Sequence, residues 1–259
     1  KRQRIALTLS ELKVQRSGYQ AHWGEIADYL LPYRLRLNLS DYGRGYRMNT
    51  NLFNSVATYA VETYESGVMY SATDPSGEWV KFATRDPDRA EFGPHRVWLD
   101  EAVDVVLGLA DDSNTYVSLA TLYGSEAGFG TAAMMVLPRN GPEAVHTEIL
   151  PTGSYWIAQE QYGDVHTVYR EFRMTVSQMY ERFGEKGHLS EHVQSLIDGS
   201  KWEEWIDVGH IVMPNRDYDG DRPSRAHKRY SSCWFELGNA QSAHGYMDNV
   251  EQFIHEGGF

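Results

Sequence analysis

The sequence changes its periodicity at Gly128-Phe129-Gly130, and this change limits the folds that the chain can adopt. Before it, apolar residues recur at the three- and four-residue spacing of helices. After it, the apolar run 132–137 and several alternating segments have the character of strands. Two glycines around one aromatic residue form a sharp backbone turn rather than a dinucleotide loop, because the third glycine is missing and a strand follows. The sequence therefore predicts an α+β fold, with a mainly helical part at 1–130 and a strand-rich part with short helices at 131–259.

Four helices are predicted in the first part. The first carries Leu12, Tyr19, Trp23, Ile26 and Leu30 on one face and ends at Pro32. The other three are expected at about 51–72, 95–110 and 116–127, and Asp111-Asp112-Ser113-Asn114 separates the last two.

The helix at 95–110 has apolar residues around most of its circumference, which predicts a buried helix. Trp98 lies in this helix and is expected in the core, as are Trp23 and Trp156. A turn at Asp74-Pro75-Ser76-Gly77 is expected to lead into a short strand at 79–82.

Turn and cap signals organise the second part. Asn140-Gly141 predicts a β-hairpin. Thr175 and Gln178 form a capping box for a helix, and Gly184 lies just past its end. A further short helix is expected at 190–197, a half-buried strand at 206–212, and another strand within 228–237.

The charge of the chain argues against tight binding of nucleic acid. The 24 Lys and Arg residues are outnumbered by 36 Asp and Glu residues, which gives a formal net charge of −12. Affinity for DNA comes mostly from cations that neutralise phosphates, so the chain is a poor candidate for gripping DNA.

Cysteine content and hydropathy restrict the compartment. Cys233 is the only cysteine, so an intrachain disulfide is impossible and a reducing compartment such as the bacterial cytoplasm is expected. No apolar run approaches the roughly 20 residues that span a bilayer, so no membrane is expected. The run Ile5 to Leu9 is too short for a signal peptide. Because the chain starts at Lys1 rather than Met, we expect that its true beginning is missing.

Two motifs suggest metal ions, but each has a stronger structural interpretation. His188-Leu189-Ser190-Glu191-His192 has the inverted zinc-peptidase pattern, in which two histidines one helical turn apart bind zinc and the glutamate is the general base. Here it lies at the edge of a short polar helix, so a metal-dependent hydrolase is kept only as an alternative.

Asn215 to Gly220 copies half of a calcium loop, but Ala226 stands at the twelfth position, so a polar hairpin tip is favoured.

A particular order of motifs occupies residues 127–184. The Gly128-Phe129-Gly130-Thr131 turn is followed by the run Pro151-Thr152-Gly153-Ser154-Tyr155 and by Gly163-Asp164-Val165. The run 169–178, with the sequence YREFRMTVSQ, and the pair Phe183-Gly184 complete it. This order resembles the head-to-tail connecting, or portal, proteins of short-tailed bacteriophages, and weaker matches extend over nearly the whole chain.

The resemblance implies a structural subunit with no enzymatic activity and no cofactor. It implies a dodecameric ring at one capsid vertex, which passes double-stranded DNA without sequence specificity. The implied partners are the terminase large subunit, the major capsid and scaffolding proteins and the tail adaptors. The protein would be a virion component that assembles in the host bacterial cytoplasm. This chain would be the wing region, with the stem, clip and crown absent. Another virion shell or adaptor protein remains an alternative.

The candidate site residues are four arginines between 34 and 47. Arg34, Arg36, Arg44 and Arg47 lie in a segment with few large aliphatic residues, which is typical of a basic loop. We expect this segment to contact DNA or a neighbouring acidic subunit, and a solvated loop is the alternative.

Overall fold

The computed structural model of the 259-residue chain describes residues 2–39, 51–86, 92–139, 141, 143–184, 189–222, 227–237 and 251–255. The chain divides into two compact units. Unit 1 comprises residues 1–22, 36–44 and 153–259, and unit 2 comprises residues 23–35 and 45–152. Each unit contains both helices and strands, and each is described by itself.

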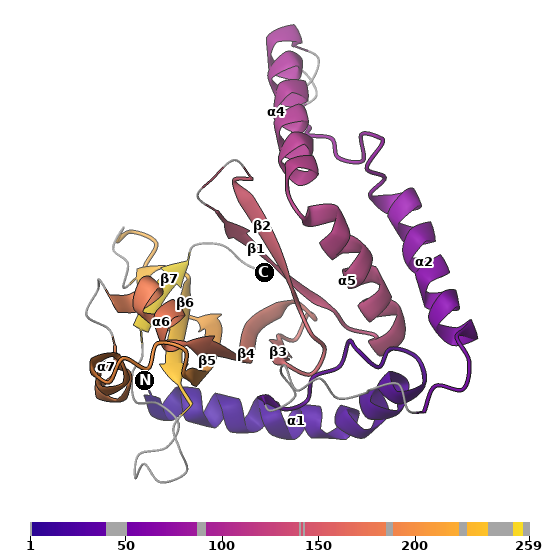
Figure 1. Ribbon diagram of the computed structural model, residues 1–259. Coiled ribbons are helices and arrows are strands. Elements are labelled where there is room, and N and C mark those ends of the chain that lie inside the picture. The colour runs from indigo at the N-terminus through magenta and orange to yellow at the C-terminus, as the bar shows by residue number, and fades with distance from the viewer. Residues whose placement is uncertain are drawn as a thin grey trace. The chain divides into compact units, whose positions relative to one another are not determined.

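The described elements confirm the α+β class (Figure 1). Helices predominate before residue 130 and antiparallel strands after it. The helices are α1 (Arg2–Tyr29), α2 (Val56–Ala72), α4 (Gly93–Asp112), α5 (Thr115–Phe129), α6 (Val176–Phe183) and α7 (Glu191–Asp198). The strands are β1 (Ala133–Pro138), β2 (Val145–Leu150), β3 (Tyr155–Gln159), β4 (Val165–Thr175), β5 (Trp205–Pro214), β6 (Tyr230–Glu236) and β7 (Glu251–His255).

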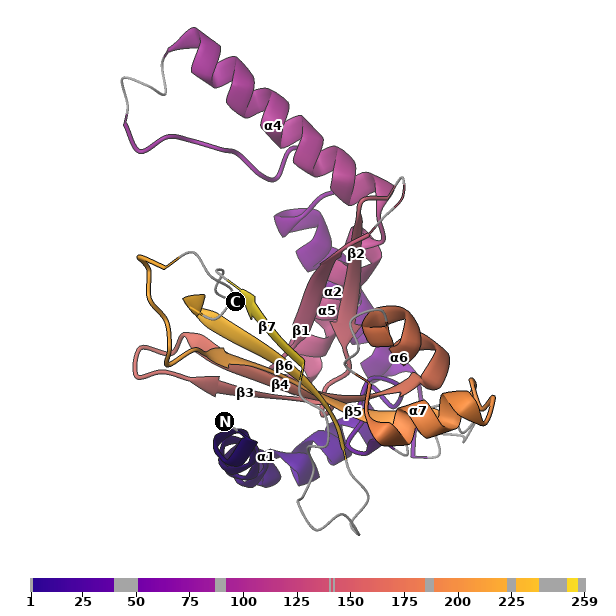
Figure 2. The same ribbon diagram turned by 90° about the vertical axis from the view of Figure 1, so that its left-hand side faces the viewer.

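Unit 1 is built on a five-stranded antiparallel sheet in the order β3-β4-β5-β6-β7. The first part of α1 covers one face, and Figure 2 shows it beneath the strands. Its Ile5, Leu9 and Leu12 pack with Tyr169 of β4 and Ile211 of β5 in one core cluster. Side chains of α1 at three- and four-residue spacing thereby bury one helix face against alternate residues of the sheet.

The opposite face of the same sheet carries α6 and α7. Val176 and Met179 of α6 and Val193 of α7 form a second core cluster with Val208 and Trp234 of the sheet. The central strand β5 is therefore buried on both faces, whereas the sequence predicted a half-buried strand at 206–212. The small Gly209 and the polar His210 obscure this in the sequence, because neither is a typical core residue and both are buried.

Unit 2 pairs helices with a hairpin. Helix α2 packs along α5, and α5 contacts the antiparallel hairpin β1–β2. The core is small, with Ala27, Leu31, Val61 and Phe129 as its buried residues. Gly130 ends α5 in the left-handed conformation at φ +70°, which confirms the predicted backbone turn.

Several local predictions are confirmed. Both hydrogen bonds of the Thr175–Gln178 capping box are present, and Gly184 is the C-cap residue of α6. The backbone N–H of Gly77 donates to the carbonyl of Asp74 in the predicted turn. The hairpin predicted from Asn140-Gly141 is β1–β2, although Asn140 itself lies outside the described residues.

Two predictions about the extent of elements in the helical part are wrong. Residues 79–82 form no strand, because no neighbouring strand pairs with them among the described residues. The second helix begins at Val56 rather than Asn51, and the side chain of Asn54 accepts a hydrogen bond from the Val56 N–H before the helix starts. Polar side chains that bond the nearby backbone compete with helix formation in this way.

Candidate interaction surfaces

The basic segment is anchored at its start by an ion pair inside unit 2. Arg34 Nη1 lies 2.6 Å from Glu65 Oε1 of α2, and the two side chains are 25% and 12% exposed. The same guanidinium donates to the carbonyl of Thr121 on α5 at 3.2 Å. A Cβ at Gly124 of α5 would collide with both charged groups. Arg34 therefore ties three segments of unit 2 together.

Arg36, the next arginine, lies against Gly153, a position where any other residue would be strained. Gly153 adopts φ +90°, and a Cβ there would approach the carbonyl oxygen of Arg36 to 2.6 Å. This turn allows the segment after Arg34 to pass close to the start of β3. Arg44 and Arg47 lie outside the described residues. The role of the four arginines in contacting DNA or a neighbour stays a prediction.

Arg16, which was not among the predicted site residues, connects α1 to the sheet of unit 1. Arg16 is 7% exposed, and its Nη1 donates to the carbonyls of Gly153 and Tyr155. Its guanidinium lies 3.6 Å from the ring centroid of Trp156. Burial lowers the pKa of Arg16 to about 10, so the group stays charged at neutral pH. The sequence signal for this role is the position of Arg16, which continues the helical spacing of the buried residues Ile5, Leu9 and Leu12.

On the other face of the sheet, a buried polar chain runs across three strands. Arg170 Nε donates to His210 Nδ1 at 3.2 Å. His210 is therefore neutral with its proton on Nε2, which donates to Ser232 Oγ at 2.7 Å. The imidazole also stacks on Trp234 with ring centroids 4.2 Å apart. These polar groups satisfy one another and hold the strands in register, a structural role.

The structure offers no support for the metal alternatives. Helix α7 begins at Glu191 with Ser190 as its N-cap, so only Glu191 and His192 of the zinc pattern lie in the helix, and His188 lies outside the described residues. In the described part of the chain, no group of three His, Cys, Asp or Glu residues could hold a metal ion.

The half calcium loop lies between β5 and β6, as a polar hairpin tip should. The side chains of Asn215 and Asp219 accept hydrogen bonds from the backbone N–H groups of Asp217 and Asp221. These are turn contacts of the loop itself. Cys233 is fully buried in β6.

Helix α4 presents apolar side chains to solvent, which contradicts the predicted burial. Val97, Trp98 and Val105 are 57%, 65% and 63% exposed, and Val103 is the buried residue of the helix. Both views show α4 extending beyond the end of α5 in unit 2 (Figures 1 and 2). Periodicity indicates which residues of a helix are apolar, but it does not say whether another element of the chain covers them. Exposed apolar surface of this kind is typical of interaction sites.

A second exposed apolar surface lies where α1 ends and α2 begins, also in unit 2. Thr58 of α2 donates to the carbonyl of Leu30 at 3.2 Å, so the two segments are adjacent. Around this contact Tyr29, Tyr33 and Tyr59 are each more than half exposed. Tyrosine is enriched in the interfaces of protein complexes, and this surface fits such a use.

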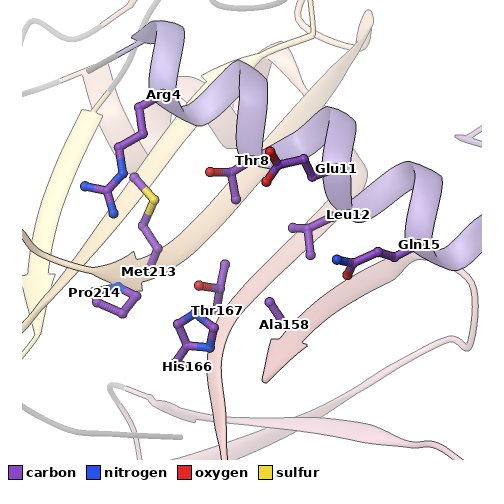
Figure 3. Close-up of a pocket in the computed structure, with 10 residues that line it drawn as sticks. All are labelled: Arg4, Thr8, Glu11, Leu12, Gln15, Ala158, His166, Thr167, Met213 and Pro214. Atoms are coloured by element: carbon purple, nitrogen blue, oxygen red, sulfur yellow. The ribbon is translucent and has the colours of Figure 1, made fainter. Parts of the chain in front are cut away.

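A cavity in unit 1 opens between α1 and the ends of β3, β4 and β5. It measures about 220 Å³, and ten residues line it (Figure 3). These are Arg4, Thr8, Glu11, Leu12, Gln15, Ala158, His166, Thr167, Met213 and Pro214. Ligand pockets for whole small molecules start at about 300 Å³, so this cavity suits a single side chain better.

Charge is divided unequally between the two units. Unit 1 has 17 basic and 19 acidic residues, whereas unit 2 has 7 basic and 17 acidic residues. Unit 2 therefore carries a net charge of −10 out of the total of −12. An acidic surface of this kind repels DNA and attracts basic protein surfaces.

No helix in the described part of the chain is long and apolar enough to cross a membrane.

Comparison with known proteins identifies the family. The model of the family described as bacteriophage head to tail connecting protein matches residues 2–250. The portal protein of Salmonella phage epsilon15 is 33% identical over 237 residues, which cover 92% of this chain and 42% of that protein. The probable portal protein of Bordetella phage BPP-1 is 35% identical over 228 residues, which cover 88% of this chain and 41% of that protein.

The chain thus spans about two fifths of the length of these curated relatives. The match nevertheless includes both units and every structural element named above except the final strand. The sequence resemblance that residues 127–184 carried is thereby confirmed, and the chain belongs to the bacteriophage head-to-tail connecting protein family.

Proposed function

We propose that this chain is part of a portal subunit, a structural protein that forms a ring at one capsid vertex. The observation that carries the proposal is the family match over residues 2–250, together with two relatives named as portal proteins. The ring would serve genome packaging, DNA retention, ejection and tail attachment. This chain would contribute the wing region, with residues 1–130 and 131–259 as its two parts.

The chemistry of the described residues supports a structural rather than a catalytic role. The buried Arg16 and the chain from Arg170 to Ser232 are occupied in holding helices and strands together. The net charge of −12 also suits a channel protein, because a like-charged wall lets DNA slide without tight binding.

The partners follow from this role. We propose a homo-oligomeric ring, a dodecamer, that contacts the terminase large subunit, the major capsid and scaffolding proteins and the tail adaptors. Double-stranded DNA would pass through without sequence readout, and the terminase would supply the ATP chemistry. The protein would be a virion component, located at the capsid vertex.

The basic segment has a place in this proposal. Arg34 holds the start of the segment through Glu65 and Thr121, whereas Arg36, Arg44 and Arg47 follow it in sequence. We propose that the segment contacts a neighbouring acidic subunit or DNA. Reversing the charges of Arg44 and Arg47 should reduce ring formation or DNA packaging, and unchanged assembly and packaging would contradict this role.

Negative-stain electron microscopy of the purified protein tests the proposal as a whole. Top views should show rings with a central hole wide enough for duplex DNA, and sedimentation velocity should give a matching large species. A shell or adaptor protein would instead give small oligomers or monomers without a hole, and that result would contradict the portal proposal.

A further inference from the structure

The β1–β2 hairpin of unit 2 has one edge that a side chain covers. On β2, the Thr147 N–H donates to Asn114 Oδ1 at 2.9 Å, and the Thr147 carbonyl accepts from Asn114 Nδ2 at 2.7 Å. These backbone groups therefore point away from β1, and the amide of Asn114 takes the place of a neighbouring strand. A covered edge of this kind is protected from pairing with another chain.

The position of Thr147 also decides which backbone groups face outward on β1. Thr147 lies opposite Val136. In an antiparallel pair, both residues at such a position direct their N–H and carbonyl groups away from the partner strand, and the pattern repeats at every second residue. Val136 and Met134 thus present donors and acceptors at the outer edge of β1. Among the described residues, no group forms a hydrogen bond with them there.

This outer edge of β1 is apolar and exposed. The strand has no charged residue, and Val136 is 62% exposed. Pro138 has no N–H to offer, so the available edge ends before it. An exposed apolar edge with unpaired backbone groups is a template for the addition of another strand.

A second segment of unit 2 has a strand-like sequence but no strand partner. Residues 79–82 have the sequence WVKF, which is rich in residues that favour strands, but they belong to no helix or strand. Trp79 holds the start of the segment, because its Nε1 donates to Tyr116 Oη of α5 at 3.0 Å. Phe82 at its end is 43% exposed. A segment that is held at one end loses less conformational freedom when it binds.

The sequence of this segment matches the outer edge of β1 in an antiparallel register. Placing Val80 opposite Val136 also places Phe82 opposite Met134. Both of these positions then form the hydrogen-bonded pairs that the outward groups of β1 require. The same register brings apolar side chains together on one face of the extended sheet, and such cross-strand pairs stabilise sheets.

The other face of this register brings opposite charges into line. Lys81 falls opposite Met135, and Met135 lies opposite Glu148 of β2. Lys81 is the only charged residue of the segment, and unit 2 carries a net charge of −10. A strand with one cation therefore suits this sheet better than an acidic strand.

We infer that residues 79–82 of one copy add as a third strand to the outer edge of β1 in the next copy. Within one chain these two segments do not pair. Because two different segments of the chain meet, the contact is head-to-tail, and contacts of this kind close rings. The inference rests on the proposed ring function and names one contact between its subunits.

The first experiment blocks the open edge with proline. Val136→Pro removes the outward N–H, whereas the bonds between β1 and β2 use other residues, so the hairpin is retained. Loss of interchain hydrogen bonds should weaken self-association about tenfold in sedimentation velocity of the purified protein. Val136→Thr keeps the N–H and the branched Cβ and should associate as the unchanged protein does. Equal association of the two variants would overturn the inference.

Val80→Pro tests the partner segment in the same assay. Residues 79–82 make no backbone hydrogen bond with other described residues, so this substitution leaves the folded subunit intact. It should weaken self-association as much as Val136→Pro does, because it removes the N–H that faces β1. Unchanged association of the Val80→Pro protein would reject this segment as the added strand.

Disulfide crosslinking tests which copies provide the two segments. Lys81→Cys/Met135→Cys places two thiols at a closely spaced position of the proposed pair, and Cys233 does not compete because it is fully buried. Oxidation should give a ladder of crosslinked chains up to the size of the ring. Each single variant should give no ladder, and a mixture of the two single variants should stop at crosslinked dimers.

The crosslinked products separate the possible failures. Pairing within one chain would give an intrachain disulfide without a ladder, and dimers from Met135→Cys alone would show that two β1 edges pair with each other. Either result contradicts the inference. Rings of the unchanged protein without a ladder from the double variant would reject this contact and retain the ring proposal. Absence of both rings and crosslinks would reject both.

Discussion

Unit 1 and unit 2 differ in how much of their apolar surface they bury themselves. In unit 1, α1 and the α6–α7 pair cover opposite faces of one sheet, and both core clusters contain aromatic residues. In the described part of unit 2, the core cluster has four buried residues, and Val97, Trp98 and Val105 of α4 are more than half exposed. Unit 2 also carries −10 of the net charge. A unit that leaves apolar and acidic surface together uncovered is suited to completion by a partner, whereas unit 1 is stabilised by its own core.

The largest expected effect comes from a core truncation in unit 1. Ile211 is fully buried between α1 and the sheet, so Ile211→Ala should lower the free energy of unfolding by about 4 kcal/mol. On α4 of unit 2, Val105→Ala should change it by no more than about 0.5 kcal/mol, because the side chain is 63% exposed. Urea denaturation measures both. Similar losses for the two variants would remove the contrast between the units.

The next effect concerns the buried arginine of unit 1. Arg16→Ala leaves the carbonyls of Gly153 and Tyr155 without their donor and removes the contact with Trp156. A loss of about 3 kcal/mol in unfolding free energy is expected from these combined contributions. Lys13→Ala is the control, since the Lys13 side chain is 45% exposed and its ion pair with Glu171 should contribute less than about 1 kcal/mol.

Arg34 gives the corresponding test in unit 2. Arg34→Ala leaves Glu65 largely buried without its ion-pair partner, and a loss of about 2 kcal/mol is expected. Arg34→Ala/Glu65→Leu should recover part of this loss, because no unpaired charge remains. Thermal unfolding of the two variants provides the comparison, and a double variant no more stable than the single one would show that the pair is not the cause.

A smaller effect is expected at the start of α6. Thr175→Ala removes the side-chain oxygen that accepts from the Gln178 N–H, which should cost about 1 kcal/mol. Thr175→Ser retains the hydroxyl and should lie close to the unchanged protein in chemical denaturation. If both substitutions cost the same, buried packing of the threonine methyl rather than capping would explain the loss.

The smallest effect is a pH dependence in unit 2. Hydrogen bonds from the side chain and backbone of Ser76 lower the pKa of Asp74 below its ordinary value of 3.8. The folded state therefore gains stability above the ordinary pKa and loses it as the pH falls through the lowered one. Ser76→Ala should bring the pKa of Asp74 back toward 3.8, and a carboxyl titration by NMR would follow this change. An unchanged titration midpoint would show that Ser76 does not hold the carboxylate.

Much of the fold could be predicted because its signals are local. The turn at Gly128-Phe129-Gly130, the Thr175 capping box and the β1–β2 hairpin each depend on residues within a few positions of one another. Backbone conformations that only glycine adopts easily, and side chains that bond the nearest N–H groups, specify such features without distant contacts. The family was recognisable for the same reason, since the order of these motifs is a property of the sequence.

The candidate surfaces depend on which segments meet, and periodicity does not contain that information. The sequence predicted a buried α4, but Val103 is its only buried residue. Arg34 was predicted to contact DNA or a neighbour, and only the fold brings Glu65 and Thr121 to it. Arg16 gained its role because α1 crosses residues that follow it by more than 130 positions.

The sequence by itself determined the α+β class, the turns and caps, the acidic balance and the family. The tertiary structure decided the burial of β5 on both faces, the internal use of Arg16 and Arg34, and the exposure of α4. Local conformational preferences act between near neighbours, so they can be read along the chain. Burial and charge pairing depend on distant segments packing together, and they become visible only when the chain is folded.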